Sequence, residues 1–391
     1  MNTDAKYINI LFALIRTEIC GEALDDNIIN SIDSKTIASI YSLAKAHDLA
    51  HLAASALANH GKLGDDEISN KLQKQLMLAA HRYSRIKYDL QKASEALARA
   101  KIPFLPLKGS VIRQYYPEPW MRTSCDIDIL IHREDTERAI GALESIGFVK
   151  QQDTTKHDHQ LISSSGVHLE LHYSLRQETS VRQADSILDA VWQECSPNEP
   201  ESYCYEMSGE MFVFYHVVHM ANHFVYGGCG IRPFVDLWLL RNKMPYDSVK
   251  LDKMFAETGL TSFYKSVIEL CDVWMDGAEH SDTTAAMEEF ILTGGVYGTV
   301  ANSATVKSAK GQSKLRTFLK LAFLPRADLE IAYPKLKKYP ILLPFYQVKR
   351  WFRIFDPKKR ERVSTLTAAR NSVSREQSDR VKSLLDDLEL L

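Results

Sequence analysis

An alternating run of acidic and apolar residues, CDIDILI at 125–131, constrains the fold more than any other stretch of the chain. A period of two predicts a β-strand, because successive side chains of a strand point to opposite faces. Asp126 and Asp128 would share one face, and the isoleucines would pack against a core on the other. Carboxylates placed this way bind hard cations through oxygen, although a solvated face of an amphipathic sheet gives the same pattern.

A second alternating run, GVHLELHYS at 166–174, follows a Ser-Ser-Ser-Gly turn and predicts a hairpin. If its second strand lies beside the first run, Glu170 meets Asp126 and Asp128 as a third carboxylate. Three crowded carboxylates repel one another unless cations lie between them. The pattern therefore predicts Mg²⁺, or Mn²⁺, in the two-ion arrangement typical of phosphoryl transfer. His172 shares the face of Glu170 and would orient a metal-bound carboxylate.

In that arrangement the two aspartates would bridge both ions. Glu170 would bind the ion that activates an attacking hydroxyl group and would receive its proton.

The turn LKGS at 107–110 lies upstream of these carboxylates. Gly109 lets the backbone approach phosphate oxygens closely, and a helix beginning at Ser110 would point free N–H groups at them. The serine hydroxyl adds a donor, and Lys108 adds a positive charge. An ordinary strand-to-helix turn with serine as the N-cap is the alternative.

The order of Gly-Ser turn, DxD strand and later lone carboxylate resembles the DNA polymerase β-like nucleotidyltransferase superfamily. More narrowly, the chain resembles a bacterial family of uncharacterised nucleotidyltransferases over about 105–175, and more loosely over 45–270. In this family an LKG turn, a YP.P loop, an arginine, a DIDLL strand and a final LH pair follow one another. The matching residues here are Leu107 to Gly109, Tyr116 to Pro119, Arg122, Asp126 to Leu130 and Glu170 to His172. The fifteen residues between Ser110 and Asp126 exceed the usual spacing of the superfamily, because the YPEPW loop lies between them.

The resemblance implies an enzyme that transfers an NMP from an NTP, ATP by default, to a hydroxyl group and releases pyrophosphate. The acceptor is left open between a small molecule, a sugar, a protein and an RNA end. Arg122 would contact phosphate or hold its loop over the nucleotide, and pairing with a carboxylate such as Glu118 is the alternative. Two other functions stay open: a non-catalytic nucleotide sensor, and an antitoxin-like enzyme that nucleotidylates a partner protein.

Three histidines, His216, His219 and His223, share one face of a predicted apolar helix. They would line the acceptor cleft or simply pack within the helical region, since no zinc-type ligand spacing accompanies them. Arg232 and Asp236 are spaced for an ion pair on the next helix, with a phosphate contact of Arg232 as the alternative.

The fold class expected is α+β, with a small mixed-sheet core of the polymerase β-like type embedded in helical regions. A net charge of -2 argues against a protein that tracks long DNA. No signal peptide and no run of roughly 20 apolar residues is found, so no transmembrane segment is expected. Six scattered cysteines favour a cytoplasmic protein.

The basic-aromatic stretch 335–362 would be a helix with a solvated basic face, or would contact an anionic surface or RNA. The predicted regions are N-terminal helical 1–85, nucleotidyltransferase core 86–200, helical cleft 201–300, and C-terminal helical and basic-aromatic 301–391.

Overall fold

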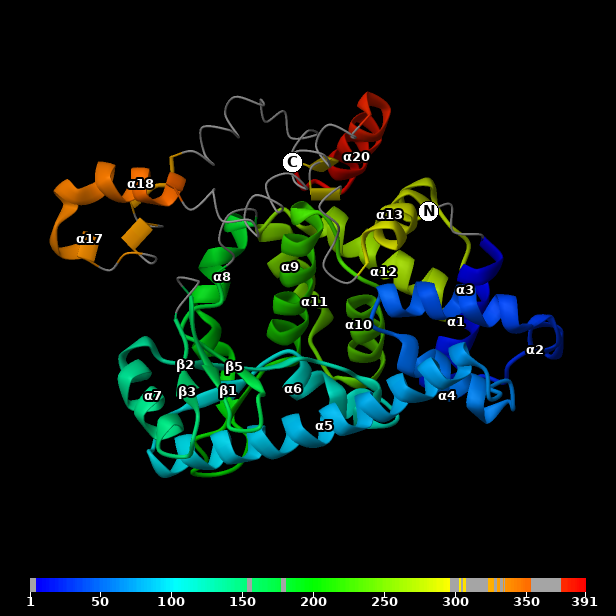
Figure 1. Ribbon diagram of the computed structural model, residues 1–391. Coiled ribbons are helices and arrows are strands. Elements are labelled where there is room, and N and C mark those ends of the chain that lie inside the picture. Colours follow the sequence, from blue (N-terminus) through cyan, green and yellow to red (C-terminus); the bar gives the residue numbers. More distant parts are fainter. Residues whose placement is uncertain are drawn as a thin grey trace.

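The computed structural model describes residues 5–152, 157–176, 181–295, 302–303, 305–306, 323–326, 329–330, 333, 335–352 and 374–391. Its five-stranded sheet lies within a mainly helical chain, which confirms the predicted α+β class (Figure 1). Within the described part, no helix combines the length and the apolarity needed to cross a bilayer. The basic-aromatic stretch predicted for 335–362 lies outside the described residues from 353 onward.

The N-terminal region is helical, as predicted. Aspartates begin three of its helices, since Asp25, Asp33 and Asp66 each accept a hydrogen bond from a backbone N–H of the first turn. The helices are α1 (Ala5–Cys20), α2 (Asp26–Ser31), α3 (Ser34–Ala46), α4 (Ala50–Asn59) and α5 (Glu67–Arg99).

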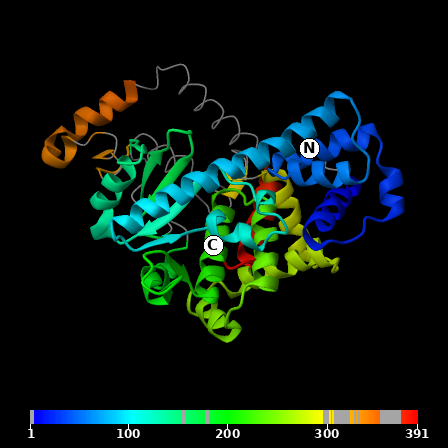
Figure 2. The same ribbon diagram turned by 90° about the horizontal axis from the view of Figure 1, so that it is seen from below.

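The long helix α5 runs from the N-terminal helices to the sheet (Figure 2), and its side chains belong to two hydrophobic cores. Leu72 in its first half packs with α1, α3 and α4, whereas Ile86, Ala93 and Leu97 in its second half pack beneath the sheet. The predicted boundary at residue 85 falls inside this helix, at the point where its packing changes.

The main sheet is mixed, with the order β1-β2-β5-β4-β3. Strands β2 and β5 are parallel, and every other pair is antiparallel. The alternating runs at 125–131 and 166–174 therefore form neighbouring strands, as predicted. The strands are β1 (Phe104–Pro106), β2 (Asp126–Ile131), β3 (Val149–Lys150), β4 (Asp158–Ile162) and β5 (His168–His172).

The two faces of this sheet have different partners. Ile127, Ile129 and Ile131 pack with Leu169 and Leu171 against α5 and α7 (Thr136–Glu144). The opposite face carries the acidic residues and continues through Leu130 into the larger core. The carboxylates therefore lie on the side of the sheet that turns toward the C-terminal helices.

The larger core joins the N-terminal helices to those that follow the sheet, and Phe12 of α1 stacks on Trp274 of α12 at 4.8 Å.

The two-stranded sheet and α8 were not predicted. The remaining elements are α6 (Gly109–Ile112), α8 (Asp185–Asp189), β6 (Cys195–Pro197), β7 (Tyr205–Met207), α9 (Gly209–Tyr226), α10 (Arg232–Lys243), α11 (Ser248–Glu257), α12 (Thr261–Asp276), α13 (Asp282–Gly294), α17 (Lys335–Lys338), α18 (Leu343–Phe352) and α20 (Arg375–Asp387), with short 3-10 turns between several of them.

Candidate active site

Two carboxylates and a histidine converge where β2 and β5 lie side by side. The parallel register places Asp128 directly opposite Glu170, which brings these two predicted site residues together. One possible ligand atom from each of Asp128, Glu170 and His172 lies within 4.8 Å of the others. His172 Nε2 donates to Asp128 Oδ1 at 3.0 Å and lies 3.4 Å from Glu170 Oε2. The two carboxylates offer oxygen ligands that fit a divalent cation, and His172 would join them as a ligand only in its neutral form.

Asp126 lies beside this cluster rather than within it. It begins β2 opposite His168, and its carboxyl group is not one of the three that come within mutual ligand distance. Burial and then the negative charge of Asp128 raise the pKa of Asp126 above its usual value. The tight group of three thus holds His172 beside Asp128 and Glu170, and the metal role of Asp126 stays a prediction. Asp126 and Asp128 are two residues apart on β2, so both lie on the same face of the sheet.

Lys108 contacts the cluster from the turn before α6. Its Nζ donates to Asp128 Oδ1 at 2.7 Å, the same oxygen that His172 contacts. The backbone of Lys108 has φ 44° and ψ −119°, a region that residues with a Cβ rarely adopt. A strained backbone thus directs this ammonium group onto a buried carboxylate.

The charges in the cluster compensate one another. Burial opposes ionisation of Asp128, yet Lys108 and His172 hold its pKa well below the usual range. Burial also opposes the charge of Lys108, but Asp128 keeps the pKa of this lysine above its ordinary value. For His172, hydrogen bonds to Asp128 and Glu170 outweigh burial and raise the pKa to about 9. The imidazole is therefore protonated at neutral pH and acts as a second cation.

The Gly-Ser turn differs from its prediction in two details. Helix α6 begins at Gly109 rather than Ser110, and no side chain caps it, so the N-cap alternative for Ser110 is wrong. Ser110 Oγ is instead buried and has no hydrogen-bond partner among the described residues. A Cβ at Gly109 would lie 2.3 Å from Arg122 Nη1. The glycine is required here because a guanidinium group packs directly against the turn.

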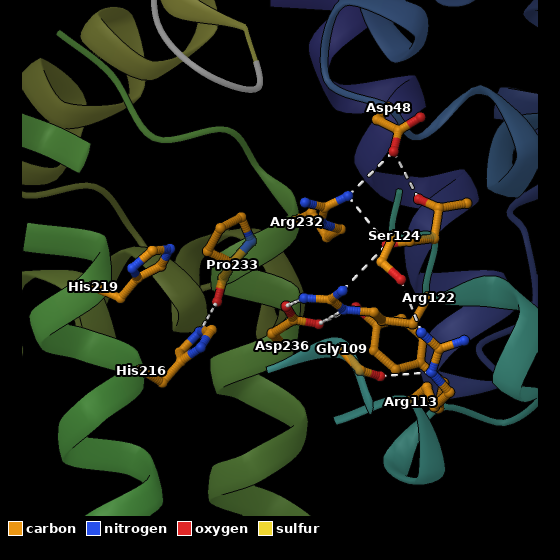
Figure 3. A network of polar contacts seen from close by, with 12 residues as sticks. Asp48, Gly109, Arg113, Arg122, Ser124, His216, His219, Arg232, Pro233 and Asp236 are labelled. Atoms are coloured by element: carbon orange, nitrogen blue, oxygen red, sulfur yellow. Dashed lines mark hydrogen bonds and ion pairs between the residues drawn. The ribbon is translucent and has the colours of Figure 1, made fainter. Parts of the chain in front are cut away.

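Arg122 belongs to a buried polar network behind this turn (Figure 3). Its Nη2 donates to Asp236 Oδ2 at 3.0 Å, and its Nε donates to Asp236 Oδ1 at 3.3 Å. The Tyr116 hydroxyl group donates to the same carboxylate at 2.7 Å. The carboxylate partner of Arg122 is therefore Asp236, not Glu118 as considered from the sequence. These contacts account for the arginine without a phosphate.

The predicted ion pair between Arg232 and Asp236 is wrong. Arg232 Nη1 donates to Asp48 Oδ2 and to the carbonyl oxygen of Thr123, both at 3.1 Å (Figure 3). Arg232 stands at the first position of α10 and turns toward the N-terminal helices, whereas Asp236 faces the buried guanidinium of Arg122. Spacing along one helix could not reveal these two long-range partners.

Arg113 supports the turn from its other side, and the sequence reasoning missed it. Its Nε donates to the carbonyl oxygen of Gly109 at 2.6 Å, and its Nη2 donates to Ser124 Oγ at 2.9 Å (Figure 3). Burial and the nearby charge of Arg122 lower the pKa of Arg113 to about 10. The spacing of four residues between Gly109 and Arg113 was the one sequence signal for this contact.

Helix α9 carries two histidines on which the positive charge of Lys108 acts. His219 Nε2 and His223 Nε2 are 3.0 Å apart, so one ring donates to the other. Burial and then the positive charge of Lys108 lower the pKa of both, to about 4 for His223. His216 instead binds the carbonyl oxygen of Pro233 at 2.9 Å, which is the packing role considered for it. Among the described residues, Asp128, Glu170 and His172 form the one group of three side chains placed to hold a metal ion. This group includes none of the three histidines of α9.

Tyr215 is a further residue of α9 on which the charges of the cluster act, and the sequence did not single it out. It lies one turn before His219, and the two ring centroids are 6.3 Å apart. Burial raises the pKa of Tyr215 to about 12, and the charges of Lys108 and Asp128 also act on its hydroxyl group. A tyrosine in an apolar helix usually packs in the hydrophobic core, so nothing in the sequence marked Tyr215 as a site residue.

One comparison with known proteins bears on this site. A family model described as "Uncharacterised nucleotidyltransferase" matches residues 33–276, well over half of the chain. The matched region contains the sheet, the Gly-Ser turn, the carboxylate cluster and helix α9. No match was found among curated proteins.

Proposed function

Because the chain belongs to this family of uncharacterised nucleotidyltransferases, we propose that it transfers an NMP from an NTP to an acceptor hydroxyl group and releases pyrophosphate. Family membership makes the protein an enzyme that transfers nucleotidyl groups. ATP as the donor, Mg²⁺ or Mn²⁺ as the cofactor and a hydroxyl acceptor are the finer parts of the proposal.

The observation that carries the proposal is the convergence of Asp128, Glu170 and His172 beside Lys108. Asp128 and Glu170 would hold a divalent ion, with Asp126 turned toward the same site. When bound, such an ion neutralises phosphate charge and lowers the pKa of a ligated hydroxyl group. The two oxygen donors suit Mg²⁺ or Mn²⁺.

The residues of the chain then have distinct roles in the transfer. Lys108 would leave Asp128 and place its charge on the phosphates, and the unpartnered hydroxyl group of Ser110 would donate to a phosphate oxygen. The acceptor oxygen forms a bond to the α-phosphorus, and the bond from this phosphorus to the bridging oxygen of pyrophosphate breaks. Glu170, which is partly exposed, accepts the proton of the acceptor hydroxyl group.

Arg122 is proposed as a positioning residue. A direct phosphate contact would require it to leave Asp236, and the Gly109 backbone already packs against its guanidinium. Arg113 would hold the same turn through the Gly109 carbonyl oxygen. Together the two arginines would fix the backbone that presents Ser110 to the nucleotide.

Helix α9 is proposed as the acceptor side of the site. Tyr215, His219 and His223 lie at successive turns of one face, and the charge of Lys108 acts on all three. Neutral imidazoles and a protonated phenol offer both donors and acceptors to a polyhydroxylated molecule. A small molecule or a sugar fits this description, and a protein or RNA end stays open.

All six cysteines are free thiols. Free thiols are what a reducing compartment maintains, and this supports a cytoplasmic setting for the proposed reaction.

The test is transfer of label from [α-³²P]ATP, and from each of the other NTPs, to components of a cell lysate. Asp126→Asn, Asp128→Asn and Glu170→Gln should each abolish labelling, because each removes one ionised ligand or base. Glu118→Gln is the matched control, since Glu118 is exposed on the neighbouring loop. Labelling by Glu170→Gln at the rate of the control would remove Glu170 from the reaction.

A further inference from the structure

An exposed apolar stripe follows α18 and the turn before it. Ile341, Phe345 and Val348 are 87%, 60% and 42% exposed. Their spacing of four and then three residues places them on one face of a helix. Ile341 is the most exposed of the large hydrophobic side chains in the described part of the chain. Isolated exposed apolar residues are common on proteins, but a continuous stripe marks an interaction surface.

The stripe is not the side of α18 that packs on the rest of the chain, because the other side of the helix already makes those contacts. Gln347 is buried, and its Nε2 donates to the carbonyl oxygen of Leu324 at 2.6 Å. Tyr346 stacks on Tyr333 at 4.6 Å, and Trp351 lies edge-on to Phe323 at 5.3 Å. The helix therefore turns a glutamine and two aromatic rings inward and an apolar stripe outward.

Positive charge surrounds this stripe. Residues 335–352 contain five lysines and arginines and no acidic residue, within a chain of net charge -2. Lys335, Lys338 and Lys349 are exposed. Both ribbon views place α17 and α18 at the edge of the molecule, apart from helices α9 to α13 (Figures 1 and 2). The partner of this segment must accordingly be anionic and must accept aliphatic side chains.

We propose that α17, α18 and the turn between them form a docking surface for an anionic lipid bilayer. Ile341, Phe345 and Val348 insert at the boundary between headgroups and acyl chains, while Lys338 and Lys349 contact lipid phosphates. Single-stranded RNA is the other anionic partner of this size, but it is bound through phosphate contacts and stacking on aromatic rings. Ile341 and Val348 have no ring to stack, so the lipid surface accounts for more of the exposed residues.

The experiment measures cosedimentation of the full-length protein with phosphatidylcholine vesicles, with and without phosphatidylserine, at low and high salt. We expect binding that requires phosphatidylserine and weakens with salt. The double variant Ile341→Ser/Phe345→Ser should bind at least about tenfold more weakly, because two buried apolar side chains contribute more than a tenfold change in partition. Lys338→Gln and Lys349→Gln should each weaken binding about fivefold. All these residues are exposed, so thermal unfolding should be unchanged.

Val249→Ser is the matched control, since Val249 is 78% exposed on α11, which lies outside this segment. This control should bind vesicles like the wild-type protein. Wild-type binding by the Ile341→Ser/Phe345→Ser variant, or no binding of the wild-type protein to phosphatidylserine vesicles, overturns the proposal. Tighter binding to an RNA oligonucleotide that depends on Ile341 and Phe345 would identify an RNA surface instead. A change in sedimentation velocity caused by this variant without vesicles would show that a second copy of the chain covers the stripe.

Discussion

Asp236→Ala removes the carboxylate that neutralises the buried guanidinium group of Arg122. The two side chains are 1% and 8% exposed and lie 3.0 Å apart. Removing one partner of a buried ion pair costs about 3–5 kcal/mol, because the other charge stays buried and unpaired. The hydroxyl group of Tyr116 also loses its acceptor, at a cost of roughly 1 kcal/mol. We therefore expect the free energy of unfolding to fall by about 4 kcal/mol or more, as measured by urea denaturation followed by circular dichroism.

The double variant Arg122→Met/Asp236→Leu separates charge from packing. Replacing a whole buried pair with apolar side chains is often neutral or stabilising, so this variant should regain much of the stability lost in Asp236→Ala. Asp189→Ala is the control, because it breaks the exposed Arg176–Asp189 pair, and exposed pairs contribute about 0–1 kcal/mol. A loss of less than about 1 kcal/mol in Asp236→Ala would refute the reasoning. If the double variant is stable but binds ATP much more weakly, Arg122 supports nucleotide binding as well as stability.

Three further predictions concern the turn and one buried histidine. Lys108→Gly should be about 1–3 kcal/mol more stable to urea than Lys108→Met, because both lose the charge but only glycine relieves the positive φ; equal stabilities would contradict the strain. Gly109→Ala should lower the thermal midpoint less in the Arg122→Met/Asp236→Leu background than in the wild-type protein, since the new Cβ meets Arg122 Nη1; equal losses in the two backgrounds would contradict that contact. Burial lowers the pKa of His47 from 6.5 to about 4, so the unfolded state binds the proton first and stability falls as pH drops from 6.5 toward 4. His47 accounts for about 3 kcal/mol of this loss, and urea midpoints of His47→Phe should show a flatter pH profile over this interval.

Local periodicity predicted the part of the site that depends on local structure. Alternation along 125–131 and 166–174 set which side chains share a face, and the structure then pairs β2 with β5 in parallel. Asp128, Glu170 and His172 were therefore accessible from the sequence. Which of the acidic side chains come closest was not, because alternation fixes a face but not the position of each residue along the register.

Long-range partners could not be predicted in the same way. Arg122 and Asp236 are 114 positions apart, and Arg232 and Asp48 are 184 apart. Spacing on a single helix instead suggested the pair of Arg232 and Asp236, because local spacing is the only distance that a sequence displays. Which carboxylate an arginine reaches depends on how α10 packs on the N-terminal helices, and that is a property of the whole core.

The charge balance of the cluster links these local and long-range features. Asp126, Asp128 and Glu170 face one site, and Lys108 and protonated His172 are the cations that contact it. Lys108 and His172 both contact Asp128 Oδ1, so in the proposed reaction both would have to release this oxygen before it could bind a metal ion. The phosphates of an NTP offer Lys108 an alternative partner of higher charge. Because Arg122 and Arg113 fix the neighbouring Gly109, Lys108 can change partner through its side chain while the turn stays in place.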